Sequence, residues 1–358
     1  MKKSIRYISL VIATGACLMT WMESCRQKNA SQRVSNEFVF AEKLSQYGFF
    51  QGEMKAQLVR NNGDRYELIT PLFTDYAVKD RFIILPAGQA MQYRDSGVLD
   101  FPDSTFILKS FSYIDSLRQK VLIETRMLFK DPFDHHWKVM DYVWNQAQTD
   151  AVKTIIGANI PIALRNADDK LVHTNYLVPN TNDCKRCHNN NNILIPIGPK
   201  ARNLNFIADA HIGNQLQAWS AKGRLKGLPA AEKIPLLPNW QDDKRYSITE
   251  RARAYLDVNC AHCHMPGGDA VNTGLFLQYE ETKPIHLGIN KEPVSAGGGA
   301  GGLNYDLVPG DAKSSILAYR MNSTEPGTAM PELGRTLIHH EGVKLVQDWI
   351  NQMKKADK

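Results

Sequence analysis

The sequence predicts an α+β protein in which an N-terminal β-rich, sandwich-like domain precedes two mainly α-helical segments. Three observations lead to this prediction. Short runs of β-branched and aromatic residues, separated by turn residues, fill positions 37–165. The motif C-x-x-C-H then occurs twice, at residues 184–188 and 260–264. Helical patterns precede the second copy and end the chain, so each motif is expected to organise one helical segment.

The N-terminus has the pattern of a bacterial export signal, predicted over residues 1–25. Basic residues precede a largely apolar run at 7–22. A retained membrane anchor is the alternative, because that run approaches spanning length. We expect Cys25 to be the lipidated first residue of a mature lipoprotein, with Cys17 as the alternative. Cys25 leaves no odd thiol once the four later cysteines are assigned. Residues 26–36 would then be a polar tether.

The β-rich domain is predicted over residues 37–165. Its runs have strand composition and partial alternation of apolar residues, and Gly, Pro, Asn and Asp mark the turns between them. Strands are expected at 66–70, 81–85, 105–114 and 120–129. An aromatic and imidazole cluster at 135–144 is expected to pack in the core and rim, with a ligand pocket as the alternative.

The spacing C-x-x-C-H is the attachment signature of a c-type haem. Residues three and four apart share one face of a helical turn, so both thiols can reach the two vinyl groups of one haem. The adjacent histidine then ligates the iron. Two such haems are predicted, with Cys184, Cys187, Cys260 and Cys263 as thioether positions and His188 and His264 as proximal ligands. A four-cysteine zinc site is the alternative, although it leaves both histidines unexplained.

The first haem segment, residues 166–245, contains no obvious distal ligand. No methionine lies between His188 and Cys260, and His211 is the one histidine in that interval. His211 is therefore the distal candidate, with a solvated loop residue as the alternative interpretation. Other candidates lie in or beside the β-rich domain, or the position is open or filled by water. These candidates are Met127, His135, His136, Met140 and His173.

The second haem segment, residues 246–354, has a more complete pattern. Ser247 and Glu250 form a capping box that opens a helix running into the motif. Loops follow, then Met330 before a proline, then an amphipathic helix at 341–353. This order is the layout of a cytochrome c domain, so both segments are expected to be cytochrome c-like. Met330 is the predicted distal ligand opposite His264.

With these residues assembled, the chain resembles a bacterial family of diheme c-type cytochromes with an N-terminal β-rich region. The resemblance covers nearly all of the mature chain. It implies an exported, often membrane-associated electron carrier with two covalent haems. The stretches that carry it are L-S-Q-Y-G-F-F at 44–50, T-P-L-F-T-D-Y-A at 70–77, I-E-T-R at 123–126, P-I-G-P-K-A-R-N-L-N at 196–205, R-A-Y-L-D-V-N-C-A-H-C-H at 253–264 and M-P-E-L-G-R-T at 330–336.

The sequence therefore predicts an electron carrier of the bacterial periplasm or outer envelope, anchored as a lipoprotein. Its expected partners are envelope redox proteins. The net charge of +6 is scattered, with no basic run, so no nucleic-acid partner is expected. Whether the chain is also an enzyme is left open, because an open first haem would suit a diheme peroxidase or another haem oxidoreductase. A third hypothesis makes the β-rich domain a ligand or partner module with the haems as its redox output.

Overall fold

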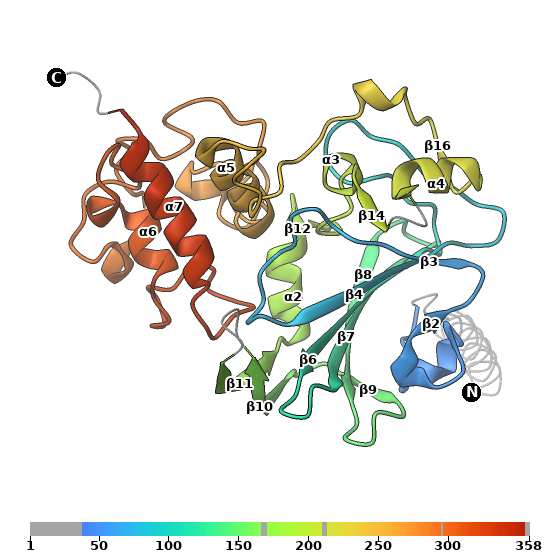
Figure 1. The fold of residues 1–358 in the computed structure, drawn as a ribbon. Helices are drawn as coiled ribbons and strands as arrows, with labels where there is room; N and C mark the ends of the chain where they lie inside the picture. Colours follow the sequence, from blue (N-terminus) through green and yellow to red (C-terminus); the bar gives the residue numbers. More distant parts are fainter. Residues whose placement is uncertain (1–37, 166–169, 210–212, 295, 355–358) are drawn as a thin grey trace, which may run out of the picture. The chain divides into compact units, whose positions relative to one another are not determined.

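The computed structural model describes residues 38–165, 170–209, 213–294 and 296–354. Residues Phe40–Lys358 form one compact unit, shown in Figure 1. The predicted export signal and tether, with Cys17 and Cys25, lie outside the described residues. The predicted boundary after residue 165 falls at the end of the first strand of a hairpin.

A six-stranded sheet is the largest element, and neighbouring strands in it are antiparallel. Its strand order is β3-β4-β6-β7-β8-β9. The strands are β3 (Gly63–Arg65), β4 (Val78–Ile84), β6 (Phe106–Ile114), β7 (Lys120–Lys130), β8 (Trp137–Trp144) and β9 (Ala151–Thr154). The strands predicted at 81–85, 105–114 and 120–129 are confirmed, whereas residues 66–70 follow β3 as irregular chain.

Short pairs of strands surround this sheet. Four are antiparallel and the pair of β5 and β16 is parallel. The members are β1 (Phe50–Gln51) with β2 (Leu58–Val59), β10 (Ala158–Arg165) with β11 (Leu171–Val178), β12 (Asn189–Asn190) with β13 (Ile193–Leu194), β14 (Ile207–Asp209) with β15 (Gly213–Asn214), and β5 (Met91–Gln92) with β16 (Leu225–Lys226).

The α-helices of the described residues are few and short. The longest, α5 and α7, have 12 and 13 residues, and the other four have eight or fewer. They are α2 (Thr181–His188), α3 (Ala201–Leu204), α4 (Gln215–Ala221), α5 (Ile248–Asn259), α6 (Ile316–Met321) and α7 (His340–Gln352). A 3-10 helix, η1 (Leu44–Tyr47), ends at the left-handed Gly48.

The predicted fold class is therefore wrong. The described chain is mainly sheet with small helices, and two mainly helical cytochrome c-like segments are not present in it. One large sheet replaces the expected sandwich. The physical reason is that C-x-x-C-H requires only one local helical turn. In the first segment that turn is α2, which packs against β8 of the sheet instead of against other long helices.

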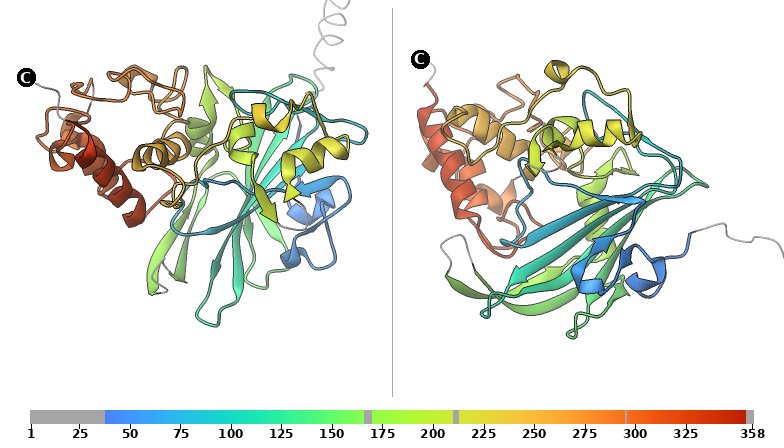
Figure 2. Two further views of the ribbon diagram at one scale, coloured as in Figure 1. Left: turned by 45° about the horizontal axis from the view of Figure 1, so that its top comes forward. Right: turned by 45° about the vertical axis from the view of Figure 1, so that its right-hand side comes forward.

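One face of the sheet divides into three zones along the strands. Alternation places residues 107, 109 and 111 of β6 on this face. Ile107 packs in an apolar cluster with Leu204 and Trp219, from α3 and α4. Phe111 packs with Tyr176 of the β10–β11 hairpin. Charged side chains lie between these apolar ends, and Figure 2 shows helices covering this side of the strands.

The opposite face is covered by the N-terminal part of the unit. The Phe50 ring meets Phe82 of β4 edge to face, with centroids 5.3 Å apart. The Tyr47 hydroxyl lies 2.9 Å from that of Tyr142 of β8. Aromatic pairs of this kind add about 0.5–1.5 kcal/mol beyond their buried area. This packing buries the far face completely around Met127, which has no exposed surface.

Helices α5, α6 and α7 share a second hydrophobic core. The predicted capping box begins α5: the Ser247 hydroxyl accepts from the Glu250 amide at 3.3 Å, and the Glu250 carboxylate accepts from the Ser247 amide at 2.8 Å. Leu256 of α5 and Val346 of α7 are fully buried in this core. Within the described residues, no helix is both long and apolar enough to cross a membrane.

Candidate functional site

The first C-x-x-C-H motif is held on the sheet by helix α2. The Asn180 side chain caps this helix by accepting from the amides of Asn182 and Asp183, at 2.9 and 3.0 Å. Cys184 is buried, and its thiol donates to the Asp141 carboxylate of β8 at 3.6 Å. Burial raises the pKa of Cys184, so its thiol is neutral. The motif therefore faces the sheet.

His188, the last residue of α2, has one ring nitrogen already occupied. Its Nδ1 lies 2.7 Å from the Ile195 carbonyl, which fixes Nδ1 as the protonated nitrogen. Burial lowers the pKa of His188 to about 3, so the ring is neutral. Nε2 is then a free lone pair. This is the arrangement of metal-binding histidines, which usually donate the other ring N–H to a carbonyl or carboxylate.

The second motif directly follows α5. Its histidine, His264, has Nδ1 at 3.5 Å from the Thr273 hydroxyl, and its carbonyl accepts from the Leu277 amide at 2.9 Å. Burial lowers the pKa of His264 to about 4. Both predicted proximal histidines are therefore neutral and fixed by neighbouring backbone or hydroxyl groups.

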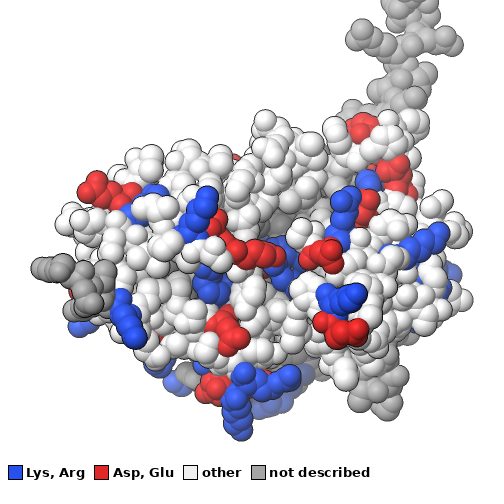
Figure 3. All heavy atoms as spheres, turned by 90° about the horizontal axis from the view of Figure 1, so that it is seen from above, with Lys and Arg blue, Asp and Glu red and all other residues white. Residues whose placement is uncertain are grey.

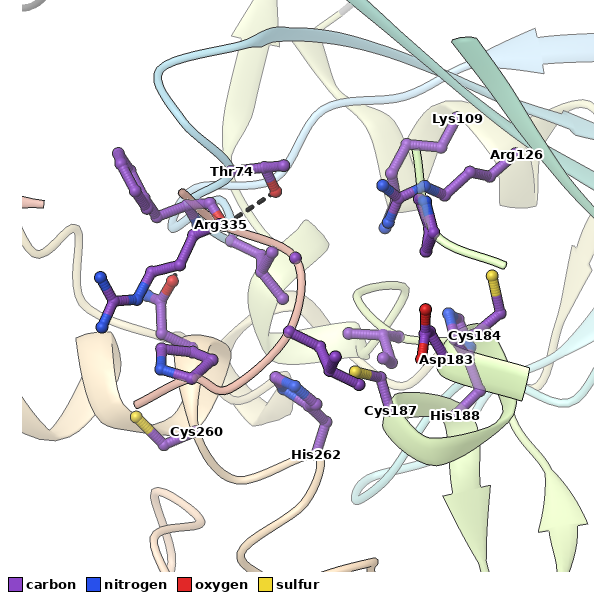
Figure 4. Close-up of a pocket in the computed structure, with 18 of the residues that line it drawn as sticks. Thr74, Lys109, Arg126, Asp183, Cys184, Cys187, His188, Cys260, His262 and Arg335 are labelled. Carbon is purple, nitrogen blue, oxygen red and sulfur yellow. Dashed lines mark hydrogen bonds between the residues drawn. The ribbon is translucent and has the colours of Figure 1, made fainter. Parts of the chain in front are cut away.

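A cavity, here called the sheet-side cavity, opens between the sheet and both motifs. It encloses about 1250 Å³ of space including its mouth. Its wall includes His188, Cys184 and Cys187 from α2 and Lys109 and Arg126 from the sheet, as Figure 4 shows.

A row of charged residues crosses the sheet beneath this cavity. In adjacent strands, Arg81 lies opposite Lys109, Lys109 opposite Arg126, and Arg126 opposite Asp141. Arg126 is paired with Glu124 at 2.6 Å. Lys109 has no hydrogen bond or ion pair within the described part of the chain, and burial lowers its pKa to about 7. Like charges directly opposite in a sheet are destabilising, so this row indicates a functional requirement.

A second cavity, the loop-side cavity, adjoins the first. It encloses about 1540 Å³ including its mouth, and His264, Leu277, Ile316 and Met330 are in its wall. Met330 also lines the sheet-side cavity. The predicted pair of His264 and Met330 therefore lines one cavity, and their roles as axial ligands stay a prediction.

Met330 lies in a loop anchored by two side chains that the sequence interpretation did not assign. The buried Asp75 carboxylate accepts from the amides of Thr336 and Leu337 and from the Thr336 hydroxyl, each at 2.8 Å. The Arg335 guanidinium donates to the Met330 carbonyl at 2.9 Å. These bonds fix the backbone on both sides of the methionine.

Residues 70–77 connect the segments that form the cavities. Thr70 exchanges two hydrogen bonds with the Asn203 side chain, at 3.0 and 3.1 Å. The Phe73 amide donates to the Asn259 side chain, just before the second motif, at 2.8 Å. With Asp75 bound to the Met330 loop, this segment contacts three other stretches that carry the family resemblance, at 196–205, 253–264 and 330–336.

His339, the residue directly before α7, lies mostly inside the molecule. Its ring stacks on Phe73 at 4.1 Å, and its Nδ1 lies 2.9 Å from the Tyr255 hydroxyl. The side chain is only 12% exposed, and burial lowers its pKa to about 4. It packs in the wall of the sheet-side cavity.

The distal candidates for the first haem do not gather at His188. His211 lies outside the described residues. Met127 is opposite Met140 in the sheet, and both alternate to the face away from the cavity. His135 is 70% exposed and pairs with Asp103, and His136 is exposed in the same turn. His173, in β11, is not in the cavity wall.

The two motifs approach each other closely at one point. The sulfur atoms of Cys187 and Cys263 and a ring nitrogen of His262 lie within 4.8 Å of one another. This is a donor set that can hold a metal ion such as Zn²⁺. His262 occupies a variable position of the motif, and the sequence interpretation gave it no role.

The residues of the two motifs also fit two covalent haems. Each motif offers two free thiols and a neutral, oriented histidine in or beside a cavity. The sequence interpretation missed Lys109, Arg126, Asp75 and Arg335, although each lies in or near a stretch that it quoted. Comparisons of this chain with family models, curated proteins and solved structures gave no match.

Proposed function

We propose that the protein is an exported diheme c-type cytochrome that carries electrons between redox partners of the bacterial envelope. Cys184 and Cys187 would bind one haem, and Cys260 and Cys263 the other. The haems supply reversible one-electron chemistry when bound. The chain's own residues attach them, provide His188 and His264 as ligands, exclude water and tune the potential.

The observation that supports this proposal best is the state of the two motif histidines. Each is half-buried, neutral and held at Nδ1, beside two thiols and a cavity. A histidine on a solvated surface would not need this orientation. A thioether such as Met330 raises the potential of a haem, which suits an electron carrier.

Intact-mass measurement tests the attachment. We expect the exported protein to carry two added haem masses that survive acid extraction. Magnetic circular dichroism during a redox titration then reports both axial ligand sets and both potentials. Protein without added haem would refute the proposal.

An enzyme with an open first haem is the second candidate, and one observation favours it. The cavity beside His188 holds none of the distal candidates found in the described chain, but it does hold Lys109. In its protonated form, Lys109 would favour a small anion or peroxide bound at an iron that lacks a distal ligand. A ferric spectrum that is wholly low-spin and unchanged by cyanide or peroxide would exclude this enzyme.

A zinc protein is the third candidate, because Cys187, His262 and Cys263 form a compact donor set. It predicts bound zinc and free thiols at Cys184 and Cys260. Metal analysis and thiol counting on the same purified sample separate this candidate from the cytochrome, in which all four thiols are consumed.

Lipidation and location are part of the proposal. Cys25 would carry the lipid, with Cys17 as the alternative, so Cys25→Ser should release the protein from membranes. Donor and acceptor would be envelope redox proteins. On the face seen in Figure 3, acidic and basic side chains are interspersed, which favours short-range docking over long-range charge steering.

A further inference from the structure

The two motifs lie close together at residues that occupy the same position in each motif. Cys187 and Cys263 are each the second cysteine of their motif, directly before the histidine. Their sulfur atoms are no more than 4.8 Å apart. The first cysteines have different surroundings: Cys184 donates to Asp141 of the sheet, whereas Cys260 directly follows α5. The approach therefore involves one specific side of each motif.

Other contacts hold the motifs in this arrangement. The Asn191 amide, after the first motif, donates to the Gly267 carbonyl, after the second, at 2.7 Å. Gly267 has φ +81°, and a Cβ there would lie 2.6 Å from the Asn191 side chain, so the close approach requires glycine. Arg186, inside the first motif, pairs with Asp269 at 3.0 Å and with Glu332 at 3.1 Å.

The two cavities share a wall at the same place. Cys187, Cys260, His262 and Met330 line both the sheet-side and the loop-side cavity. His188 lines only the first, and His264 only the second. Each cavity therefore has its own predicted proximal histidine, and one layer of side chains separates them.

We propose that Cys187 and Cys263 hold the two haems edge to edge, so that they form one electronically coupled pair. This inference rests on the proposed function, since it requires both covalent haems. A thioether sulfur is separated from the conjugated ring by a single carbon atom, so two sulfurs no more than 4.8 Å apart would place the ring edges close together. In the exchange, one Fe(II) is oxidised to Fe(III) as the other Fe(III) is reduced. No bond or proton moves, and the envelope redox partners supply and remove the electron.

Circular dichroism in the main haem absorption band tests the contact on the wild-type holoprotein. Coupled haems give a couplet of opposite signs when both irons are in the same oxidation state. The couplet should be present in the oxidised and reduced protein. At half reduction it should fall below the mean of the two end spectra, because the two absorption bands no longer coincide. A spectrum that changes linearly throughout the titration would overturn the inference.

Single-haem variants provide the matched control. Cys184→Ala with Cys187→Ala removes one attachment site, and Cys260→Ala with Cys263→Ala removes the other. Each should give a band of one sign, and their sum should not reproduce the wild-type spectrum. If a variant fails to fold, the wild-type titration decides. Two haems by mass with additive spectra would refute only the contact, whereas absence of haem would refute the proposed function.

Discussion

Asp257 holds together two parts of the chain that carry different motifs, and its removal gives the sharpest prediction. The residue lies near the end of α5, with its side chain 1% exposed. It accepts from the Lys200 ammonium and the Arg202 guanidinium, each at 3.2 Å, and from the Tyr279 amide at 3.1 Å. Asp257→Asn keeps the shape but removes the charge that both cations face.

The expected loss of stability depends on how much solvent exposure and how many ion-pair partners Lys200 and Arg202 keep in the variant. Removing one partner of a buried ion pair costs about 3–5 kcal/mol. Lys200 keeps 23% exposure, and Arg202 keeps a second partner in Glu280, so the lower limit applies. We expect Asp257→Asn to reduce the free energy of unfolding by about 3 kcal/mol, which is roughly a hundredfold change in the equilibrium constant.

Denaturant unfolding of the purified holoprotein at constant pH measures this loss. Asp348→Asn is the matched control, because Asp348 pairs with Lys344 on the exposed side of α7, and such pairs contribute about 0.3–0.5 kcal/mol. Adding Lys200→Met to Asp257→Asn should recover part of the loss by removing the unpaired cation. A change below about 1 kcal/mol in Asp257→Asn would refute the argument.

Three further predictions concern the walls of the cavities. Met330→Ala should abolish the red absorption band of a sulfur-ligated ferric haem and lower the potential of the second haem. Met321→Leu, in the same cavity walls, should leave the band and the potential unchanged. A band that survives in Met330→Ala would contradict Met330 as the distal ligand. Asp75→Asn should cost about 2 kcal/mol and speed amide hydrogen exchange at Thr336, because hydrogen bonds to a charged acceptor are lost; unaltered exchange would show that the loop is held elsewhere. His339 has its pKa lowered to about 4 by burial, so its stabilising contribution is complete above pH about 6.5 and declines towards pH 4 as the unfolded chain takes up a proton, by up to about 3 kcal/mol. His339→Gln should make the loss of stability between pH 7 and 4.5 smaller in urea unfolding measurements, and an equal loss in the two proteins would count against this prediction.

Local patterns in the sequence were sufficient for several elements. The capping box at Ser247 begins α5, and the apolar spacing near the C-terminus corresponds to α7. These features depend on residues three or four positions apart, so they do not require knowledge of the rest of the chain. The prediction of the fold class was wrong because C-x-x-C-H specifies one helical turn and was taken to specify a helical domain.

The residues of the cavity wall are brought together by the register of paired strands, which short sequence patterns do not reveal. Lys109 and Arg126 are 17 positions apart in sequence and directly opposite in the sheet. Only the pairing of β6 with β7 and the docking of α2 show that both face His188. The burial of His339 also depends on a distant part of the chain, because its stacking partner is Phe73.

The hydrogen bonds of residues 70–77 also affect the order in which parts of the chain can fold. Their partners are 133, 186 and 261 positions further along the chain. Contacts of such long range form slowly, because large loops must close first. The bond between Asp75 and Thr336 cannot form until residue 336 of 358 is present. If the proposed haems are present, their attachment to all four thiols can precede the docking of residues 70–77 onto the Met330 loop.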